Sequence, residues 1–92
     1  MSEPVTRTLT IVNVKGLHAR ASAKLVELVE DFDAEAVVSK DGMDVTGDSI
    51  MGLLMLAAAH GTTIDVATSG ADAEALADAI EALVADRFGE DA

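Results

Sequence analysis

The sequence predicts an α+β fold in which a mostly antiparallel sheet carries helices packed on one face. Segments with strand-like alternation and segments with helical periodicity follow one another in the order β-α-β-β-α-β-α. An Asp-Gly pair between two short strand-like segments indicates a hairpin. The order contains no βαβαβ run of the kind that builds parallel sheets, so an antiparallel sheet is favoured.

The first half of the chain predicts a strand, a helix and a hairpin. Thr6–Val12 alternates and is rich in β-branched residues, which is typical of a strand. The next segment has apolar residues at i, i+3, i+4 and i+7, which predicts an amphipathic helix. These residues are Leu25, Leu28, Val29 and Phe32. Ala34–Ser39 and Met43–Thr46 then predict two short strands joined by the Asp-Gly turn.

The second half predicts a helix, a strand and a final helix. Asp48 or Ser49 can cap a helix over Ile50–Ala59, which the glycine after His60 ends. Thr62–Thr68 predicts the fourth strand. The last helix is expected from about Asp72 to Arg87, with the arginine near the negative end of the helix dipole. Its apolar stripe comprises Leu76, Ile80, Leu83 and Val84.

Length and composition indicate a single domain over residues 1–92 with an aliphatic core. Ninety-two residues leave no room for a second core, and only two residues are aromatic. No apolar run could cross a bilayer, and the N-terminus does not resemble a signal peptide, so we expect no direct membrane insertion. The chain has no cysteine, which excludes disulfides and cysteine-ligated metals and favours a cytoplasmic location.

The charge balance excludes one class of partner. Seventeen acidic residues stand against six lysines and arginines, for a net charge of −11. Such a surface repels phosphate backbones and anionic lipids, so nucleic acid is not expected as a partner. The acidic residues are spread along the chain, which we interpret as adaptation of the whole surface to high salt. An ordinary acidic domain is the alternative.

The segment KGLHARASA, Lys15–Ala23, places a histidine directly before a predicted helix. The positive end of the helix dipole disfavours a charged ring, so His18 is expected to be nucleophilic, and free amides there would stabilise an attached dianion. Arg20 adds a forked cation suited to phosphate oxygens. Gly16 permits an unusual turn, which Leu17 would anchor. A histidine N-cap beside an incidental arginine is the alternative interpretation.

Two motifs in register resemble the HPr family, the histidine-containing phosphocarriers of the phosphoenolpyruvate:sugar phosphotransferase system. GLHAR followed by small residues is similar to the family's active-site motif, and DSIMGLLML, Asp48–Leu56, is similar to its second signature. The resemblance covers nearly the whole chain. It implies an open-faced β-sandwich, with a four-stranded antiparallel sheet and three helices on one face, in the order βαββαβα.

The resemblance also implies a function. His18 would accept a phosphoryl group from phosphorylated Enzyme I and pass it to a IIA-type component of sugar uptake. The Arg20 side chain and the backbone amides of Ala19 and Arg20 would hold the group, without a metal or cofactor. The protein would be a phosphoryl-transfer intermediate rather than a stand-alone enzyme, and we expect a monomer. The expected docking residues are Leu17, Ala23, Ile50, Met51 and Leu54.

Some positions depart from the family pattern or leave alternatives open. Ala21 stands where the family usually has proline, which predicts a slightly softer helix start. Acidic residues, Glu27, Glu30 and Asp48, stand near the docking face, where the family often has lysines. Ser49 matches a position that a regulatory kinase phosphorylates in some members, and a serine helix cap is the alternative interpretation, which is the more common role.

Three other functions remain open from the sequence. One is a non-transport regulatory phosphocarrier, in a nitrogen-type branch or a dihydroxyacetone kinase system. Another is a non-catalytic docking module of the same fold, which the presence of both His18 and Arg20 disfavours. The third is a small-ligand-binding domain, which would need a closed apolar pocket.

Overall fold

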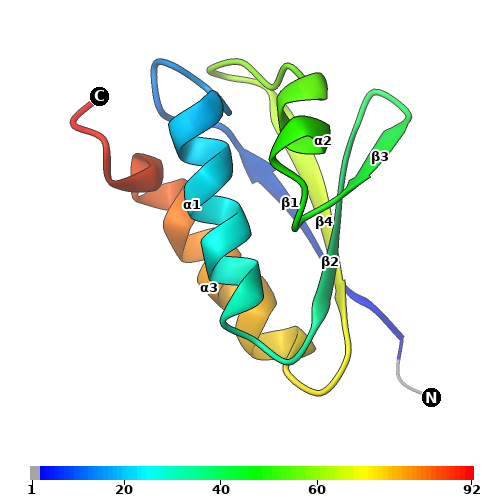
Figure 1. The fold of residues 1–92 in the computed structure, drawn as a ribbon. Coiled ribbons are helices and arrows are strands. Elements are labelled where there is room, and N and C mark those ends of the chain that lie inside the picture. The colour runs from blue at the N-terminus through cyan, green and yellow to red at the C-terminus, as the bar shows by residue number, and fades with distance from the viewer. Residues whose placement is uncertain (1–2) are drawn as a thin grey trace.

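The sheet is antiparallel and four-stranded, in the order β1-β4-β2-β3 (Figure 1). The structure is a computed structural model that describes residues 3–92, so Met1 and Ser2 of the expected domain lie outside the described residues. Its elements are β1 Val5–Thr10, α1 Ala19–Glu30, β2 Glu35–Lys40, β3 Met43–Thr46, α2 Ile50–Met55, β4 Thr63–Ser69, α3 Ala73–Ala85 and a short 3-10 turn, η1, Arg87–Gly89.

The register of the strands places alternate residues on the face that the helices cover. Leu9 of β1 is opposite Ile64 of β4, and Val38 of β2 is opposite Val66 of β4. All four side chains are buried, whereas their neighbours along β4 are exposed or half-buried. Helices α1, α2 and α3 lie on this one face of the sheet (Figure 1). The predicted α+β fold is therefore confirmed.

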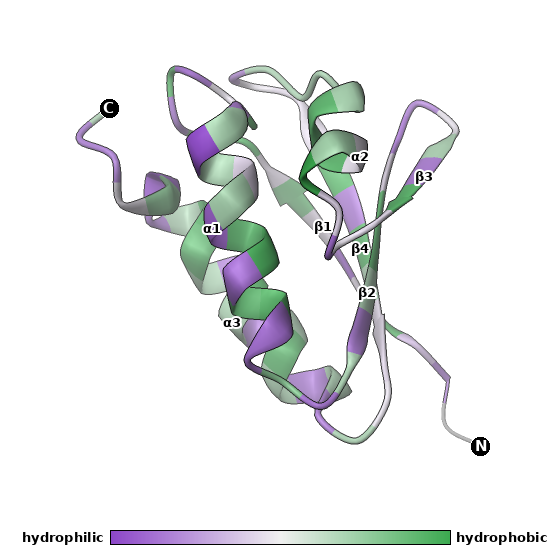
Figure 2. Ribbon diagram, viewed as in Figure 1, coloured by the Kyte–Doolittle hydropathy of each residue, from purple (hydrophilic) through white to green (hydrophobic). Residues whose placement is uncertain are grey.

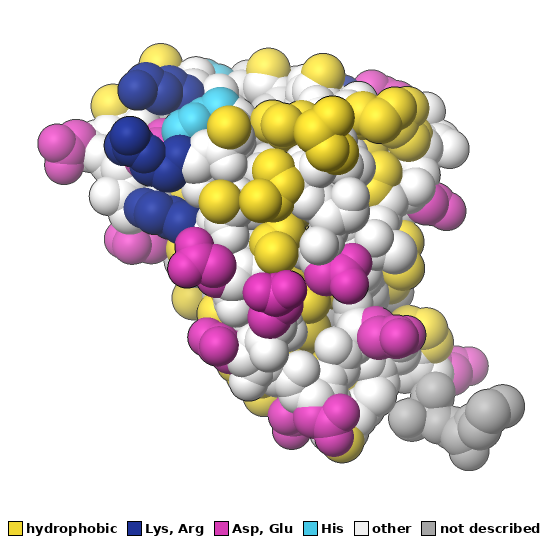
Figure 3. Space-filling view, in the orientation of Figure 1, with side chains coloured by type: hydrophobic (Ala, Val, Ile, Leu, Met, Phe, Trp, Pro, Cys, Tyr) yellow, Lys and Arg dark blue, Asp and Glu magenta, His cyan; other side chains and the backbone are white. Residues whose placement is uncertain are grey.

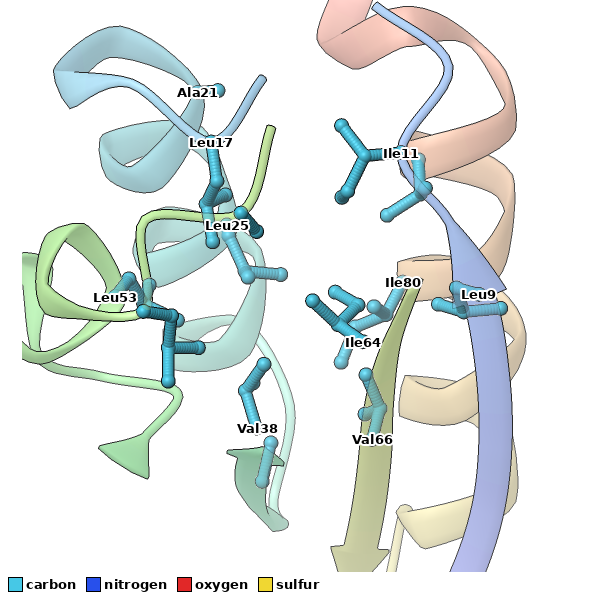
Figure 4. Packing of buried hydrophobic residues seen from close by; sticks show 14 of the residues in the cluster. Leu9, Ile11, Leu17, Ala21, Leu25, Val38, Leu53, Ile64, Val66 and Ile80 are labelled. Atoms are coloured by element: carbon cyan, nitrogen blue, oxygen red, sulfur yellow. The ribbon is translucent and has the colours of Figure 1, made fainter. Parts of the chain in front are cut away.

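The core between helices and sheet is built almost entirely from aliphatic side chains, as the composition predicts. Leu25 of α1, Leu53 of α2 and Ile80 of α3 point toward the strands and are fully buried (Figure 4). Along α1, hydrophilic and hydrophobic residues alternate in the pattern of an amphipathic helix (Figure 2). Burying these side chains supplies the main driving force that orders the sheet and helices together.

Helix α2 ends at Met55, four residues before the predicted end at Ala59. The chain turns at Ala57, which has a φ of +50° and is exposed. The turn frees the carbonyl of Ala58 to accept a hydrogen bond from Leu17 N at 2.9 Å. His60 consequently lies in the turn before β4 and not at a helix end. Here a tertiary contact overrides the helix propensity of an alanine run.

The last helix also ends earlier than predicted. Helix α3 stops at Ala85, and Arg87, Phe88 and Gly89 all have left-handed backbones, with φ of 57°, 54° and 77°. Arg87 Nη1 donates to Asp91 O at 3.1 Å, so the guanidinium binds the segment that follows and not the carbonyl groups at the end of α3. The turn buries the Phe88 side chain completely in the core. The helical periodicity before Arg87 gives no sign of this anchor.

Candidate functional site

A tightly held loop between β1 and α1 presents the histidine. Gly16 adopts a φ of +67°, and Leu17 N donates to Ala58 O, so the loop is fixed against the segment after α2. Leu17 is 4 % exposed and lies beside Ala21 and Leu25, pointing inward (Figure 4). Leu17 therefore anchors the turn, as expected. Its burial contradicts its inclusion among the docking residues, because its side chain offers no surface to a partner.

His18 is the N-cap of α1. Its backbone is extended, with φ −79° and ψ −177°, and its side chain makes no capping hydrogen bond, which leaves the ring available for other contacts. The first intrahelical bond joins Ser22 N to His18 O at 2.8 Å. The amides of residues 19–21 precede this bond, so the helix itself gives them no acceptor. An anion attached to the ring would face these amides and the positive end of the helix.

A carboxylate from the far end of the chain contacts the histidine ring. Glu90 Oε2 contacts His18 Nε2, and Glu90 Oε1 accepts a hydrogen bond from Asn13 Nδ2 at 2.9 Å. These bonds, first that from Asn13 and then that from His18, hold the pKa of the Glu90 carboxyl below its ordinary value. Because an ionised carboxylate has no proton to donate, Nε2 is the donor, and in the neutral ring Nδ1 then keeps its lone pair.

Three of the six lysines and arginines gather beside the histidine, although the whole chain is strongly acidic. Lys15, Arg20 and Lys24 line a surface hollow together with Glu90 and the following residues. Dark blue side chains cluster next to the cyan histidine on the same face (Figure 3). The local charge therefore suits a phosphoryl group, whereas the rest of the surface repels anions. Lys15 is exposed and lines this hollow.

An exposed apolar patch adjoins the histidine on the other side (Figure 3). Met51 is 70 % exposed, Ile50 is exposed, and Leu54 and Ala23 are half-buried. Met55, which is outside the expected docking residues, is 64 % exposed. Acidic side chains border the patch on the side away from the histidine (Figure 3). We call Ala23, Ile50, Met51, Leu54 and Met55 the apolar patch. Exposed methionines give such a surface adaptability toward partners.

Comparison with known proteins identifies the chain. Residues 5–86 match the family model described as "PTS HPr component phosphorylation site". The chain belongs to the HPr family. Its sequence is 49 % identical to phosphocarrier protein HPr of Cupriavidus necator over 84 residues, which cover 91 % of this chain and 94 % of that protein. It is also 40 % identical to phosphocarrier protein NPr of Escherichia coli K12 over 88 residues, which cover 95 % and 98 %.

Solved structures of HPr proteins have the same architecture. The crystal structure of HPr-C-His from Thermoanaerobacter tengcongensis aligns with a TM-score of 0.91 at 33 % identity and covers 96 % of this chain and 99 % of that one. The open-faced β-sandwich expected from the HPr resemblance is therefore confirmed. Within residues 3–92, no helix is long and apolar enough to cross a membrane. The same range contains no group of three or more histidine, aspartate and glutamate side chains that could hold a metal ion.

Ser49 opens α2 in this HPr-family chain. Its Oγ accepts a hydrogen bond from Gly52 N at 3.0 Å, which is an N-cap contact. The hydroxyl therefore has a structural role, and the expected helix cap is present. Phosphorylation of Ser49 stays a prediction, and it would exchange this cap for a charged group beside the apolar patch.

Gly16 is expected to tolerate alanine much less well than Gly42, although both have left-handed backbones. A Cβ on Gly16 would lie 2.5 Å from Ala58 O, whereas a Cβ on Gly42 would meet nothing within 4 Å. Gly16→Ala should therefore lower the free energy of unfolding by about 2 kcal/mol more than Gly42→Ala. Chemical denaturation of both variants measures the difference, and equal losses would show that the site loop can move away from Ala58.

Proposed function

We propose that this protein is a phosphocarrier whose His18 accepts a phosphoryl group from phosphorylated Enzyme I and passes it to a IIA-type component of sugar uptake. The observation that carries the proposal is the position of His18 as the N-cap of α1, with its side chain free of capping and Arg20 two residues on. Membership of the HPr family supports the same chemistry. No partner beyond Enzyme I and the IIA-type component is required, because the same ring receives the group and releases it.

The chain's own residues suit each part of the transfer. Since Nε2 contacts Glu90, Nδ1 is the nitrogen left to attack phosphorus. Arg20 and the helix dipole offset the charge of the incoming group, and the free amides of Ala19 and Arg20 can donate to its oxygens. A partly exposed ring, with 28 % of its side-chain surface accessible, can meet a donor and then an acceptor in turn. Catalysis of this type depends mainly on positioning and charge.

The direct test is phosphoryl transfer in solution. Purified protein is incubated with radiolabelled phosphoenolpyruvate and Enzyme I from the same organism, at low and at high salt. The protein should gain a phosphate that is labile in acid and stable in base, as expected for a phosphorylated histidine. If the protein gained no label at either salt concentration, the result would contradict the carrier function. Faster labelling at high salt would support adaptation of the acidic surface to a saline cytoplasm.

A nitrogen-type regulatory branch is the second candidate. The relatives include NPr proteins of Escherichia coli K12 and Shewanella violacea at 40 % and 45 % identity, as well as HPr proteins. The site chemistry would be the same in both branches, so the partner decides between them. Competition between the sugar-branch Enzyme I and its nitrogen-branch counterpart, with equal concentrations of each, would identify the preferred donor. We propose a cytoplasmic monomer in either case, since one face must meet partners of different shape.

The apolar patch is proposed as the surface that docks on Enzyme I, and Met51 is its most exposed large side chain. Met51→Glu would place a charge in the centre of a desolvated contact, so KM for the protein as substrate of Enzyme I should rise by about tenfold or more. Met43→Glu is the matched control, because Met43 is also exposed but lies on the hairpin strand β3. Both variants should unfold at nearly the wild-type temperature.

The two variants also define the result that would contradict docking. If Met51→Glu and Met43→Glu gave the same KM as wild type, the patch would not contact Enzyme I. If Met51→Glu unfolded the protein, the side chain would contribute to the core despite its exposure. Titrating salt separates the effect of the new charge from lost apolar contact, because screening relieves the charge alone.

A further inference from the structure

We propose that Glu90 is a positioning residue for phosphoryl transfer, which holds His18 by Nε2 and balances the charge that develops on the ring. The inference rests on the proposed phosphocarrier function and assigns a role to a residue outside both HPr motifs. Glu90 lies 72 positions from the histidine, beyond the end of α3.

The Glu90 carboxylate is fixed at both oxygens. Oε2 contacts His18 Nε2, and Oε1 accepts from Asn13 Nδ2. Asn13 is fully buried, and its Nδ2 also donates to Gly16 O at 2.8 Å, so the amide is itself held in place. With 15 % of its side chain exposed, Glu90 is far more confined than an ordinary surface glutamate. One carboxylate therefore connects the catalytic ring to the loop that precedes it.

The chain end is built to bring this carboxylate to the ring. Three consecutive left-handed residues, Arg87–Gly89, turn the chain after α3, and the tail reaches the N-terminal end of α1 (Figure 1). Phe88 is buried in the core, and Lys24 Nζ donates to its carbonyl oxygen. Such backbone conformations are uncommon for residues other than glycine and persist only where the surroundings hold them.

The chemistry of the ring shows what the carboxylate contributes. When Nδ1 attacks, the Nδ1–phosphorus bond forms, the bond to the donor breaks, and its electron pair leaves with the donor. The ring then carries phosphorus on Nδ1 and a proton on Nε2, and is positively charged. In the onward step the pair returns to Nδ1, and the proton on Nε2 lets the ring leave as neutral imidazole. A carboxylate on Nε2 stabilises the charged ring, as in other histidine–carboxylate pairs.

The cations nearby have a different role. Lys15, Arg20 and Lys24 line the hollow beside Glu90, where they can offset the charge of the phosphoryl oxygens. They are donors only and cannot accept the Nε2 proton, so none of them can replace the carboxylate. The geometry thus separates two tasks, with cations for the phosphoryl group and Glu90 for the ring.

The test uses Glu90→Gln, which keeps an oxygen for Asn13 and removes the charge. We expect transfer from phosphorylated Enzyme I to slow by about tenfold, the effect of losing one charge-assisted hydrogen bond. Nitrogen NMR of the ring should show less of the Nε2–H form before phosphorylation and less protonated Nε2 after it. Glu90→Asp, which restores the charge on a shorter side chain, should recover part of the rate. Asp86→Asn, an equal change of charge at the exposed end of α3, should behave as wild type.

The outcomes separate this inference from the phosphocarrier function. Unchanged transfer rates and unchanged ring spectra in Glu90→Gln would overturn the positioning role while the carrier function stands. If wild type accepted no phosphate, the carrier function would fail, and the ring spectra of the unphosphorylated variants would still test whether Glu90 holds Nε2. A loss in Asp86→Asn equal to that in Glu90→Gln would reduce the effect to general charge and also overturn the proposal.

Discussion

Replacing His18 with alanine is expected to abolish phosphoryl acceptance while leaving the fold almost unchanged. The variant removes the nucleophile, and neither Ala19 nor Arg20 can take its place, so label from Enzyme I should be undetectable. The ring makes no capping hydrogen bond and its contact with Glu90 is only part-buried, so its loss should lower the free energy of unfolding by only about 1 kcal/mol. Labelling and thermal unfolding of one preparation measure both effects.

His60→Ala is the control for this variant. His60 is exposed in the turn before β4, so its replacement should leave both labelling and stability at wild-type values. If the label persisted in His18→Ala and disappeared in His60→Ala, His60 and not His18 would be the phosphoryl acceptor. Label that persists in both variants would show that the acceptor is not a histidine.

The sequence predicts the element order well because each element carries its own local pattern. Alternation over Thr6–Val12 and the Asp-Gly turn after Lys40 depend on residues that are neighbours in the chain. The site motif is equally local, since the N-cap histidine and Arg20 lie on one short segment. Local patterns therefore sufficed to place His18 at the start of a helix.

The remaining features depend on contacts between distant segments. Helix α2 ends early because the chain turns at Ala57, where the carbonyl of Ala58 accepts a hydrogen bond from the amide of Leu17, 41 positions earlier. Leu17 lies beside an exposed histidine, yet the same bond draws it into the core. Glu90 follows the last predicted helix and has no periodic pattern that would connect it to His18. The composition and residue spacing of one sequence do not predict contacts between segments this far apart in the chain.

The distribution of charge reconciles an acidic protein with anion chemistry. A net charge of −11 would oppose the approach of a phosphorylated partner if it were spread evenly. Three of the six cationic side chains instead line the hollow at the histidine, so the field there differs from that of the whole surface. Two acidic side chains, Glu90 and Asp91, line the same hollow, so three cations face two carboxylates there, and at high salt the distant acidic residues are screened first.

Phe88→Ala is expected to be the most destabilising of the substitutions considered, with a loss of about 3–5 kcal/mol in the free energy of unfolding. Phe88 is fully buried and is the largest side chain in the core. For a domain of this size, whose total stability is about 5–15 kcal/mol, the loss should lower the Tm by at least about 12 °C. Calorimetry measures this, and Met55→Ala, at an exposed position, should change the Tm little.

The same substitution should weaken phosphoryl transfer more than Glu90→Gln does. Burial of the Phe88 ring offsets the strain of two left-handed residues, Arg87 and Phe88 itself, which costs about 1–2 kcal/mol for each. Without the Phe88 ring, the turn over Arg87–Gly89 loses its anchor in the core. Glu90 should then leave His18 even in molecules whose sheet remains folded. Phe88→Leu keeps an apolar anchor and should recover most of the transfer rate. Full activity of folded Phe88→Ala below its Tm would show that the ring of His18 does not depend on the anchored chain end.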